Sequence, residues 1–397
     1  MKKPDMILLK YGEIALKGLN RPMFEQKLLL RIRQALEPLG SFRVRKSQSM
    51  IYVEPETERA DTAEAIRRLQ KVFGIVNICP VVSCEKDMDA IGRTAVEMLS
   101  EEDLTGKSFK VEAKREDKQF PLNSPEICRQ LGGMILKNTK GLHVDVHNPD
   151  ILVQVEIRQK AHLFTQKFSG AGGMPIGTNG KATLLLSGGI DSPVAGWMIA
   201  KRGVVLDAVH FHSHPYTSDR AKEKVIDLAK ILSAYTGTIH LHVVPFTEIQ
   251  LALIEQCPKN LLTLLMRRYM MRIAEAIAKK SGARALVTGE SIGQVASQTM
   301  ESLAVTDDAV SMPVFRPCIG MDKEEIVTIS KKIDSYETSV LPYEDCCTIF
   351  VPKHPKTRPE IAEVREAEQL LQGGDDMVKR ALEGVEVITI RPGEQEE

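Results

Sequence analysis

The chain has 397 residues, of which 43% are hydrophobic and 27% are charged, and its 53 Lys and Arg residues balance 53 Asp and Glu residues. This length and composition predict a globular protein of two or three domains and argue against a disordered or membrane-spanning chain. The seven cysteines include no CxxC pair, which argues against a disulfide framework and the usual zinc spacings, so no protein-bound metal site is predicted.

The start of the chain gives no sign of a targeting segment. Lys10, Lys17, Arg21 and Lys27 interrupt its apolar positions, so neither a signal peptide nor a membrane span is expected, and a cytoplasmic protein is predicted. Basic residues outnumber acidic ones by 28 to 23 in residues 1–170, and they cluster in 31–46 and 107–118. Contact with phosphates and a solvated surface are both open explanations of these clusters.

The first part of the chain has an α+β pattern. Strands or apolar stretches are predicted at 6–11, 43–53, 75–82, 109–113 and 152–157, and helices at 21–36, 62–72, 90–99 and 125–137. A glycine-rich segment at 169–179 lacks apolar periodicity and is predicted to be a linker. A new domain is therefore expected to begin near Gly180.

Strands and helices then alternate along the second part. Strands are predicted at 183–186, 204–211, 239–245, 285–289 and 385–390, and helices at 193–202, 218–235, 261–280 and 360–372. This order predicts an α/β domain with a doubly wound parallel sheet, whose ligand site lies at the carboxyl ends of the strands. His210, Phe211 and Gly289 fall at such ends.

Residues 187–192 read Ser-Gly-Gly-Ile-Asp-Ser between a predicted strand and a predicted helix. Gly188 and Gly189 let the backbone approach an anion without Cβ clashes, while Ser187 and Ser192 add hydroxyl donors beside the unpaired N–H groups of the helix start. The glycine pair alone would also fit an ordinary turn. The full pattern resembles the PP-loop of ATP pyrophosphatases, enzymes that split ATP into AMP and pyrophosphate while adenylating a substrate.

Two further segments extend the resemblance to a whole family. Residues 10–18 resemble the N-terminal ferredoxin-like domain of the tRNA 4-thiouridine synthetases, and residues 109–133 resemble their THUMP domain. The chain is identified as a member of this family, in the form without a C-terminal rhodanese-like domain. The resemblance implies a ferredoxin-like domain at 1–58, a THUMP domain at 59–167, a linker at 168–181 and a PP-loop catalytic domain at 182–397.

The resemblance also implies the ligand contacts. Expected tRNA contacts are Lys114, Arg115 and Lys118, and expected ATP contacts are Leu185, Leu186, Ser187, Gly188, Gly189, Asp191, Ser192, His210, Phe211, Arg267, Gly289 and Gln298. Arg267 lies in an otherwise apolar helix, where a buried guanidinium needs an anion, either a phosphate or a core carboxylate. For His210, an adenosine contact and a satisfied histidine at a strand end are both open.

Four residues are expected to carry the chemistry. Asp191 is predicted to hold Mg²⁺ or to act as a base, with helix capping as the alternative. Lys323 matches a lysine of the family and is expected to neutralise charge that develops during adenylation. Matching the family's Cys-x-x-Ile pattern around Ile349 implies that Cys346 is the persulfide carrier, with Cys347 as the fallback, and the cationic residues that follow the pair would lower a thiol pKa. The other five cysteines are expected to be small buried hydrophobes.

The activity implied by the resemblance has two stages. Uracil O4 of uridine-8 attacks the α-phosphate of ATP, and a sulfur supplied by a separate cysteine desulfurase then displaces AMP. The implied cofactors are ATP and Mg²⁺, and the implied partners are tRNA, the desulfurase and a second copy of the chain in a homodimer. A PP-loop ligase acting on another substrate and a sulfur carrier in thiamine thiazole synthesis remain alternatives.

Overall fold

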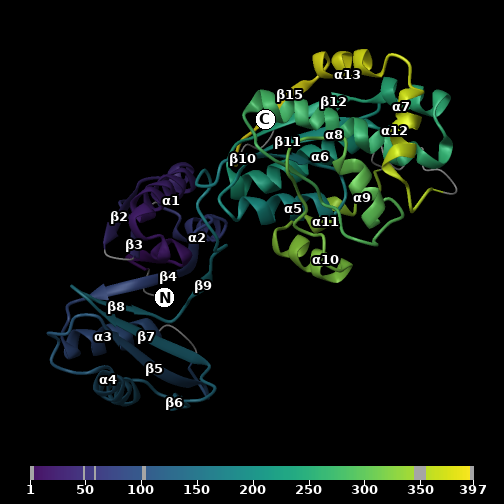
Figure 1. Ribbon diagram of the computed structural model, residues 1–397. Helices are drawn as coiled ribbons and strands as arrows, with labels where there is room; N and C mark the ends of the chain where they lie inside the picture. The colour runs from purple at the N-terminus through teal and green to yellow at the C-terminus, as the bar shows by residue number, and fades with distance from the viewer. Residues whose placement is uncertain (1–3, 48–49, 58–59, 101–103, 344–354, 394–397) are drawn as a thin grey trace. The chain divides into compact units, whose positions relative to one another are not determined.

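The computed structural model describes residues 4–47, 50–57, 60–100, 104–343 and 355–393. The chain divides into two compact units, Met1–Gly173 and Met174–Glu397, called unit 1 and unit 2 below (Figure 1). The finer boundaries predicted at residues 58 and 168–181 stay predictions.

Unit 1 is built on one nine-stranded sheet and has the predicted α+β character. Its helices are α1 (Arg21–Leu36), α2 (Thr62–Gln70), α3 (Met88–Leu99) and α4 (Ser124–Asn138). Its strands are β1 (Met6–Tyr11), β2 (Phe42–Ser47), β3 (Met50–Pro55), β4 (Ile75–Cys84), β5 (Ser108–Arg115), β6 (His143–Val144), β7 (Ile151–Ile157), β8 (Ala161–Phe164) and β9 (Phe168–Ser169). Their order is β2-β3-β1-β4-β8-β7-β5-β6, with β9 paired to β4.

The long strand β4 joins the two halves of this sheet. Its first part pairs antiparallel with β1, from Ile75 to Val81, and its last three residues pair with β8. Separate groups of buried apolar side chains lie along the two halves, one around Leu8 and Cys79 and one around Phe109. Unit 1 is therefore one continuous sheet with a core in each half.

Unit 2 is the α/β part of the chain. Its strands are β10 (Lys181–Leu185), β11 (Val205–His212), β12 (Ile239–Pro245), β13 (Leu286–Val287), β14 (Val314–Phe315) and β15 (Glu386–Ile390). Its helices are α5 (Asp191–Ala200), α6 (Asp219–Thr236), α7 (Thr247–Gln256), α8 (Leu262–Ser281), α9 (Met300–Asp307), α10 (Lys323–Lys332), α11 (Tyr336–Ser339), α12 (Ile361–Gln369) and α13 (Gly374–Glu383).

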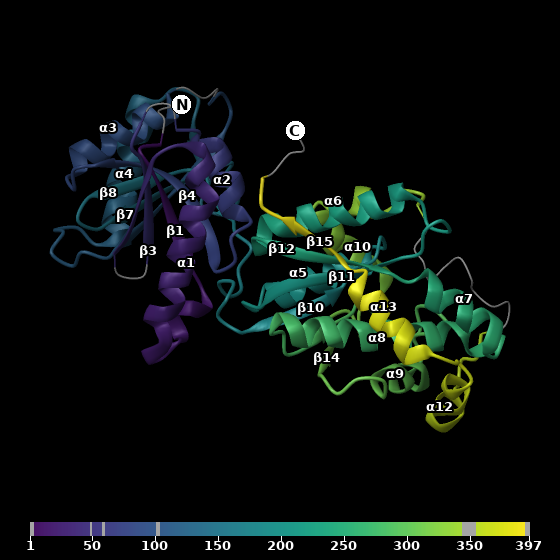
Figure 2. The ribbon, with the colours of Figure 1, turned by 90° about the horizontal axis from the view of Figure 1, so that it is seen from above.

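The six strands of unit 2 form a sheet of order β14-β13-β10-β11-β12-β15. Every pair is parallel except β12 with β15, so the predicted parallel sheet gains one antiparallel strand at its edge. The chain moves in one direction from β10 to β12 and then crosses back to β13, and right-handed crossovers place the two sets of helices on opposite faces. Figure 2 shows α6 and α8 on opposite sides of the strands.

The reversal of strand order between β10 and β13 positions the site. At such a switch point, the loops that follow the two neighbouring strands diverge and leave a crevice at their carboxyl ends. The 187–192 loop follows β10 and Gly289 follows β13. Beneath them, α8 is buried on several sides and ends at Gly282, whose φ of 76° is the left-handed conformation that favours glycine at a helix end.

Candidate functional site

The two serine hydroxyls of the 187–192 loop hold the loop in shape. Ser187 N donates to Ser192 Oγ at 3.0 Å, and Gly189 N donates to Ser187 Oγ at 3.3 Å. The hydroxyls, expected as donors to an anion, thus also bond within the loop. A Cβ placed on Gly189 would meet only Ser187 Oγ, at 3.5 Å, so the space beside this backbone is open to a ligand.

Asp191 is the first residue of α5, and its carboxylate joins three elements. Lys323 Nζ lies 2.9 Å from Oδ1, and Gln294 Nε2 donates to Oδ2 at 3.2 Å. The helix-capping alternative is not observed, because Ile190 occupies the N-cap position and no side chain caps the helix. The carboxylate therefore contacts the side chains of Lys323 and Gln294 rather than the backbone N–H groups at the start of its own helix.

Lys323 is the first residue of α10, whose start is fixed by a reciprocal capping box. Asp322 Oδ1 accepts from Glu325 N at 2.9 Å, and Glu325 Oε2 accepts from Asp322 N at 3.0 Å. Such a box satisfies two N–H groups that the helix itself leaves unpaired. The Lys323 ammonium is consequently presented from a well-defined helix start, with its side chain 48% exposed.

Gly289 permits a close approach between two backbone segments. A Cβ at this position would lie 2.6 Å from Asp191 C and 2.6 Å from Ser192 N. Since both are backbone atoms, they cannot move aside without shifting the start of α5. A glycine after β13 is thus needed to let the 187–192 loop and the end of β13 meet.

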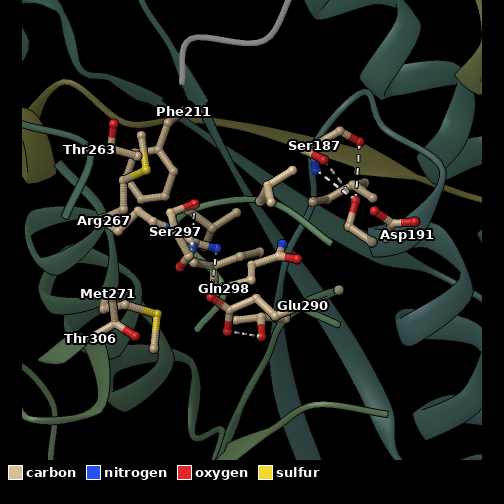
Figure 3. A pocket seen from close by; sticks show the side chains of 18 of the residues that line it. Ser187, Asp191, Phe211, Thr263, Arg267, Met271, Glu290, Ser297, Gln298 and Thr306 are labelled. Atoms are coloured by element: carbon tan, nitrogen blue, oxygen red, sulfur yellow. Dashed lines mark hydrogen bonds and ion pairs between the residues drawn. The ribbon is translucent and has the colours of Figure 1, made fainter. Parts of the chain in front are cut away.

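A cavity of about 430 Å³ extends from this loop. Ten of the predicted ATP contacts line it, namely Leu185, Leu186, Ser187, Asp191, Ser192, His210, Phe211, Arg267, Gly289 and Gln298. Figure 3 shows Ser187 and Asp191 at one end and Thr263, Arg267, Met271 and Thr306 at the other. The structure therefore brings together residues from five separate stretches of sequence, and whether they bind ATP stays a prediction.

His210 is 4% exposed on the cavity wall. Burial lowers its pKa to about 4, so the ring is neutral near pH 7. Its Nδ1 lies 3.2 Å from Leu186 O, so that nitrogen carries the proton and donates. The other nitrogen, Nε2, is a buried acceptor with no partner among the described residues. An unsatisfied acceptor beside a cavity fits a ligand that brings a donor.

Arg267 forms an ion pair with Glu290, which also lines the cavity. Its Nη1 donates to Ser297 O at 2.8 Å. Of the two partners considered for this guanidinium, the structure shows the carboxylate. The next residue, Arg268, is the deeply buried one, and it pairs with Glu368 at 2.8 Å and Asp308 at 3.0 Å.

Glu290 was not identified from the sequence, although it is 4% exposed at the site. It accepts from Thr288 Oγ1 at 2.8 Å and from Arg316 Nε at 2.7 Å. Burial alone would raise the pKa of Glu290, but the charges of Arg267 and Arg316 lower it. A signal existed in Glu290-Ser291, two polar residues directly after the predicted strand 285–289.

The predicted RNA contacts lie in unit 1. Lys114, whose side chain is 61% exposed, pairs with Glu116 at 2.6 Å. Arg115 Nη1 donates to Phe120 O at 3.2 Å, which ties down the chain that follows β5, and Lys118 is exposed. Lys118 and Lys114 are accessible to an anion, whereas Arg115 also stabilises the backbone that follows β5.

Cys346 and Cys347 lie outside the described residues. Of the other cysteines, Cys79, Cys257 and Cys318 are buried and Cys84 and Cys128 are half-buried. Burial raises the pKa of Cys79 to about 11 and that of Cys318 to about 12. Both side chains are therefore protonated thiols rather than reactive thiolates near pH 7.

None of the helices among the described residues is long and apolar enough to cross a membrane. Within the same ranges, no group of three or more His, Cys, Asp or Glu residues is arranged to hold a metal ion.

Three family models match the chain in sequence order. Residues 6–79 match the ThiI ferredoxin-like domain, residues 85–165 match the THUMP domain, and residues 177–372 match the family described as Thiamine biosynthesis protein (ThiI). The ferredoxin-like, THUMP and PP-loop parts of the predicted fold are thereby confirmed.

Relatives match over nearly the full length. A "Probable tRNA sulfurtransferase" of Acetivibrio thermocellus is 57% identical over 98% of this chain and 99% of its own. Another of that name from Caldanaerobacter subterraneus is 58% identical over 92% of this chain and 95% of its own. A solved 4-thiouridine synthetase in complex with RNA and ATP has a TM-score of 0.86 at 39% identity, covering 97% of this chain and 99% of the other. The chain therefore belongs to the ThiI family of tRNA sulfurtransferases, the family that its sequence resembles.

Proposed function

We propose that this protein uses ATP to transfer sulfur to uridine-8 of tRNA, giving 4-thiouridine. The observation that carries the proposal is the joining of the 187–192 loop, the Asp191–Lys323 pair and the cavity into one site. The name of the relatives, "Probable tRNA sulfurtransferase", and a similar solved structure with bound RNA and ATP support the choice of substrates.

The site fits a nucleotide in size and chemistry. A cavity of about 430 Å³ is within the range of small-molecule sites. Leu185, Phe211 and Met271 offer apolar walls to a base, and His210 Nε2 offers an acceptor. The backbone N–H groups of the 187–192 loop and the start of α5 suit phosphate oxygens. ATP supplies an electrophilic α-phosphate with pyrophosphate as its leaving group.

Asp191 and Lys323 have separate proposed roles in the first stage. The Asp191 carboxylate is the proposed oxygen ligand for Mg²⁺, a hard cation that prefers such ligands. The Lys323 ammonium is the proposed neutraliser of the charge that develops when uracil O4 attacks the α-phosphate and pyrophosphate leaves. Because Gln294 and Lys323 both hold Asp191, the carboxylate is oriented before any ligand binds.

The second stage needs a thiol that can carry sulfur. The buried Cys79 and Cys318 do not suit this role, because burial raises the pKa of both thiols. The proposed carrier is Cys346, with Cys347 as the fallback, and it receives its outer sulfur as a persulfide from a cysteine desulfurase. The outer sulfur bonds to C4 of the adenylated uracil while the C4–O bond breaks and AMP leaves, so the uracil is linked to the carrier cysteine by a disulfide. A second thiol then attacks the carrier's sulfur, which releases 4-thiouridine and forms a disulfide between the two thiols, and an added thiol reductant returns both to the reduced form.

The tRNA is proposed to contact unit 1 through Lys114, Arg115 and Lys118. Uridine-8 packs inside folded tRNA and must be exposed before it reacts, so recognition is expected to rest on shape and backbone rather than base sequence. A homodimer, in which one subunit holds the tRNA for the other's site, is part of the same proposal.

The test measures 4-thiouridine in tRNA after incubation with ATP, Mg²⁺, cysteine and a cysteine desulfurase. Wild type is expected to form product, whereas Asp191→Ala and Cys346→Ser are expected to form none. If Cys347→Ser is the inactive thiol variant instead, the two cysteine roles are exchanged. If wild type consumes ATP and leaves uridine-8 unmodified, the substrate is wrong, and a ligase or a sulfur carrier for thiamine synthesis becomes the better proposal.

A further inference from the structure

Thr263 lies in the first turn of α8 and lines the cavity. Its Oγ1 is buried, yet this atom has no hydrogen-bond partner among the described residues. A buried hydroxyl without a partner costs free energy, because it has given up its hydrogen bonds to water. Such a group on a cavity wall needs an explanation, and hydrogen bonding to a bound ligand provides one.

Two other threonines line the same cavity, and both of their hydroxyls are hydrogen-bonded. Thr306 Oγ1 donates to Leu303 O at 2.9 Å, and Thr288 Oγ1 donates to Glu290 at 2.8 Å. A helical threonine often bonds a carbonyl of the preceding turn, as Thr306 does. Among the described threonines of the cavity, Thr263 therefore differs in leaving both its proton and its lone pairs available to a ligand.

The place of Thr263 in the cavity indicates which part of a nucleotide it would meet. Figure 3 shows Thr263 at the end away from Ser187 and Asp191. The ribose of a nucleoside triphosphate lies between the base and the phosphates, so phosphates at the 187–192 loop place the base at the far end. Phe211 and Met271 offer apolar surface to a base at that end.

The guanidinium that shares a helix face with Thr263 is already paired. Arg267 follows Thr263 by four residues on α8, so the two side chains lie on the same side of the helix. Arg267 forms its ion pair with Glu290, and its Nη1 donates to Ser297 O at 2.8 Å. A paired guanidinium attracts a phosphate less than a free one does. This end of the cavity is therefore better suited to a neutral base than to a phosphate.

The hydrogen-bonding groups of the cavity favour adenine over guanine. His210 Nε2 is a buried acceptor with no partner among the described residues. An acceptor attracts an amino group and repels a carbonyl oxygen. Adenine carries an amino group at the ring position where guanine carries an oxygen. A threonine hydroxyl can also accept from an amino group, so both unpartnered side chains match this group.

We infer that Thr263 recognises the base of the nucleotide, with its hydroxyl oxygen accepting a hydrogen bond from the exocyclic amino group of adenine. This inference rests on the proposed function, because it takes the ligand to be ATP. The hydroxyl would contact neither the phosphates nor the uracil. Its loss should therefore weaken ATP binding and leave the turnover rate at saturating ATP unchanged.

The test combines a change in the protein with a change in the ligand. Thr263→Val replaces the hydroxyl by a methyl group of similar size, and purine riboside 5′-triphosphate is ATP without its amino group. Dissociation constants for both nucleotides with Mg²⁺ are measured by titration calorimetry on the full-length proteins without tRNA. Thr328→Val is the matched control, because Thr328 is a helical threonine of α10 whose Oγ1 donates to Glu324 O at 2.8 Å.

Thr263→Val should weaken ATP binding about three- to tenfold, the loss expected for one neutral hydrogen bond. It should change the affinity for purine riboside triphosphate by less than about twofold, since that ligand has no amino group to lose. Thr328→Val should match wild type for both nucleotides. An equal loss of affinity for both nucleotides, or unchanged ATP binding by Thr263→Val, would overturn the inference.

Thr263→Ser keeps the hydroxyl and should bind ATP within about twofold of wild type. If Thr263→Val does not fold, Thr263→Ala replaces it under the same criteria. Wild type separates this inference from the function on which it rests. Failure of wild type to bind ATP refutes the proposed use of ATP, whereas normal ATP binding and 4-thiouridine formation by wild type with an unaffected Thr263→Val refutes only the recognition of the base.

Discussion

Charged side chains at the exposed positions of the unit 1 sheet and those around the cavity of unit 2 are held differently. On the sheet of unit 1, cations pair with carboxylates at exposed positions, as Arg43 does with Glu56 at 3.1 Å and Lys114 with Glu116 at 2.6 Å. In unit 2, charged groups around the cavity are held from several elements, as Asp191 is by Lys323 and Gln294. Exposed pairs are weak and screened by salt, whereas fixed groups at a cavity are oriented in advance.

This contrast indicates where single substitutions should matter. A cation on an exposed strand is one of many that a polyanion can meet, so its removal is compensated by its neighbours. A group that three elements hold beside a cavity has no substitute. We therefore expect large effects on turnover in unit 2 and small effects on tRNA affinity in unit 1.

The largest effect is expected for Lys323→Met. Removing the charge that is proposed to stabilise the first stage should lower tRNA-dependent AMP formation by about 100-fold or more. The melting temperature should change little, because an exposed ion pair contributes at most about 1 kcal/mol to stability. Lys230→Met is the control, since Lys230 pairs with Asp227 on α6 and should leave both quantities unchanged. A normal rate of AMP formation by Lys323→Met would contradict the expectation that charged groups at the cavity of unit 2 have the largest effects.

Gly289→Ala tests the close approach of backbones at the same site. The added Cβ would lie 2.6 Å from Asp191 C, so the start of α5 must shift. Overpacking of this kind costs about 1–3 kcal/mol, and we expect a lower melting temperature together with a fall in AMP formation of about tenfold. Gly320→Ala is the matched control, because its Cβ would meet nothing within 4 Å. Equal behaviour of the two variants would contradict the packing argument.

A pH effect on stability is expected from His210. Burial lowers its pKa to about 4 from an ordinary value of 6.5, so between these values the unfolded chain binds a proton that the folded chain does not. The free energy of unfolding should therefore fall as the pH drops from 6.5 towards 4. Trp197, the chain's single tryptophan, is buried in unit 2, and its fluorescence during urea unfolding reports on this unit.

His210→Gln should make this dependence shallower. It should not remove it, because burial also lowers the pKa of His212 and His242. An unchanged slope in His210→Gln would mean that the buried ring is not the source.

Most long elements of both units were predictable, and the reasons lie in their sequences. Helix α1 and strand β12 were predicted with the bounds that the structure has, because apolar residues recur at helical spacing in α1 and alternate with histidines in β12. Helix α7 was missed, since no side chain caps its start at Phe246. Strand β14 has two residues and depends on pairing with β13, which no local pattern can reveal.

Site residues that directly follow strands of the sheet could be predicted from the sequence. Those in irregular loops could not. His210, Phe211 and Gly289 were expected at the site because parallel strands present their carboxyl ends together, whereas Leu186 was implied by the resemblance to the family. Gln294 and Ser297 lie in an irregular segment after β13, and their bonds to Asp191 and Arg267 span 103 and 30 residues. Sequence reasoning correctly expected an anion for Arg267, but it could not tell that Glu290 would supply one.

The smallest effects are expected for the lysines of unit 1, and they rank by local pairing. Lys118 is exposed and has no ion pair among the described residues, whereas Lys114 already pairs with Glu116 at 2.6 Å. A cation that must leave a carboxylate to meet a phosphate gains less from doing so. We expect Lys118→Ala to raise the KM for tRNA about two- to threefold with kcat unchanged, and Lys114→Ala to raise it less.

Salt dependence separates a phosphate contact from a structural defect in these variants. Loss of one phosphate contact should reduce the slope of log affinity against log salt by about 1, whereas a distorted fold would lower kcat as well. Lys379→Ala is the control, because Lys379 is an exposed lysine of unit 2 that pairs with Asp376 at 3.1 Å. If Lys379→Ala weakens tRNA binding as much as Lys118→Ala, the tRNA does not distinguish the two units by charge, and the pairing of cations in unit 1 has no bearing on recognition.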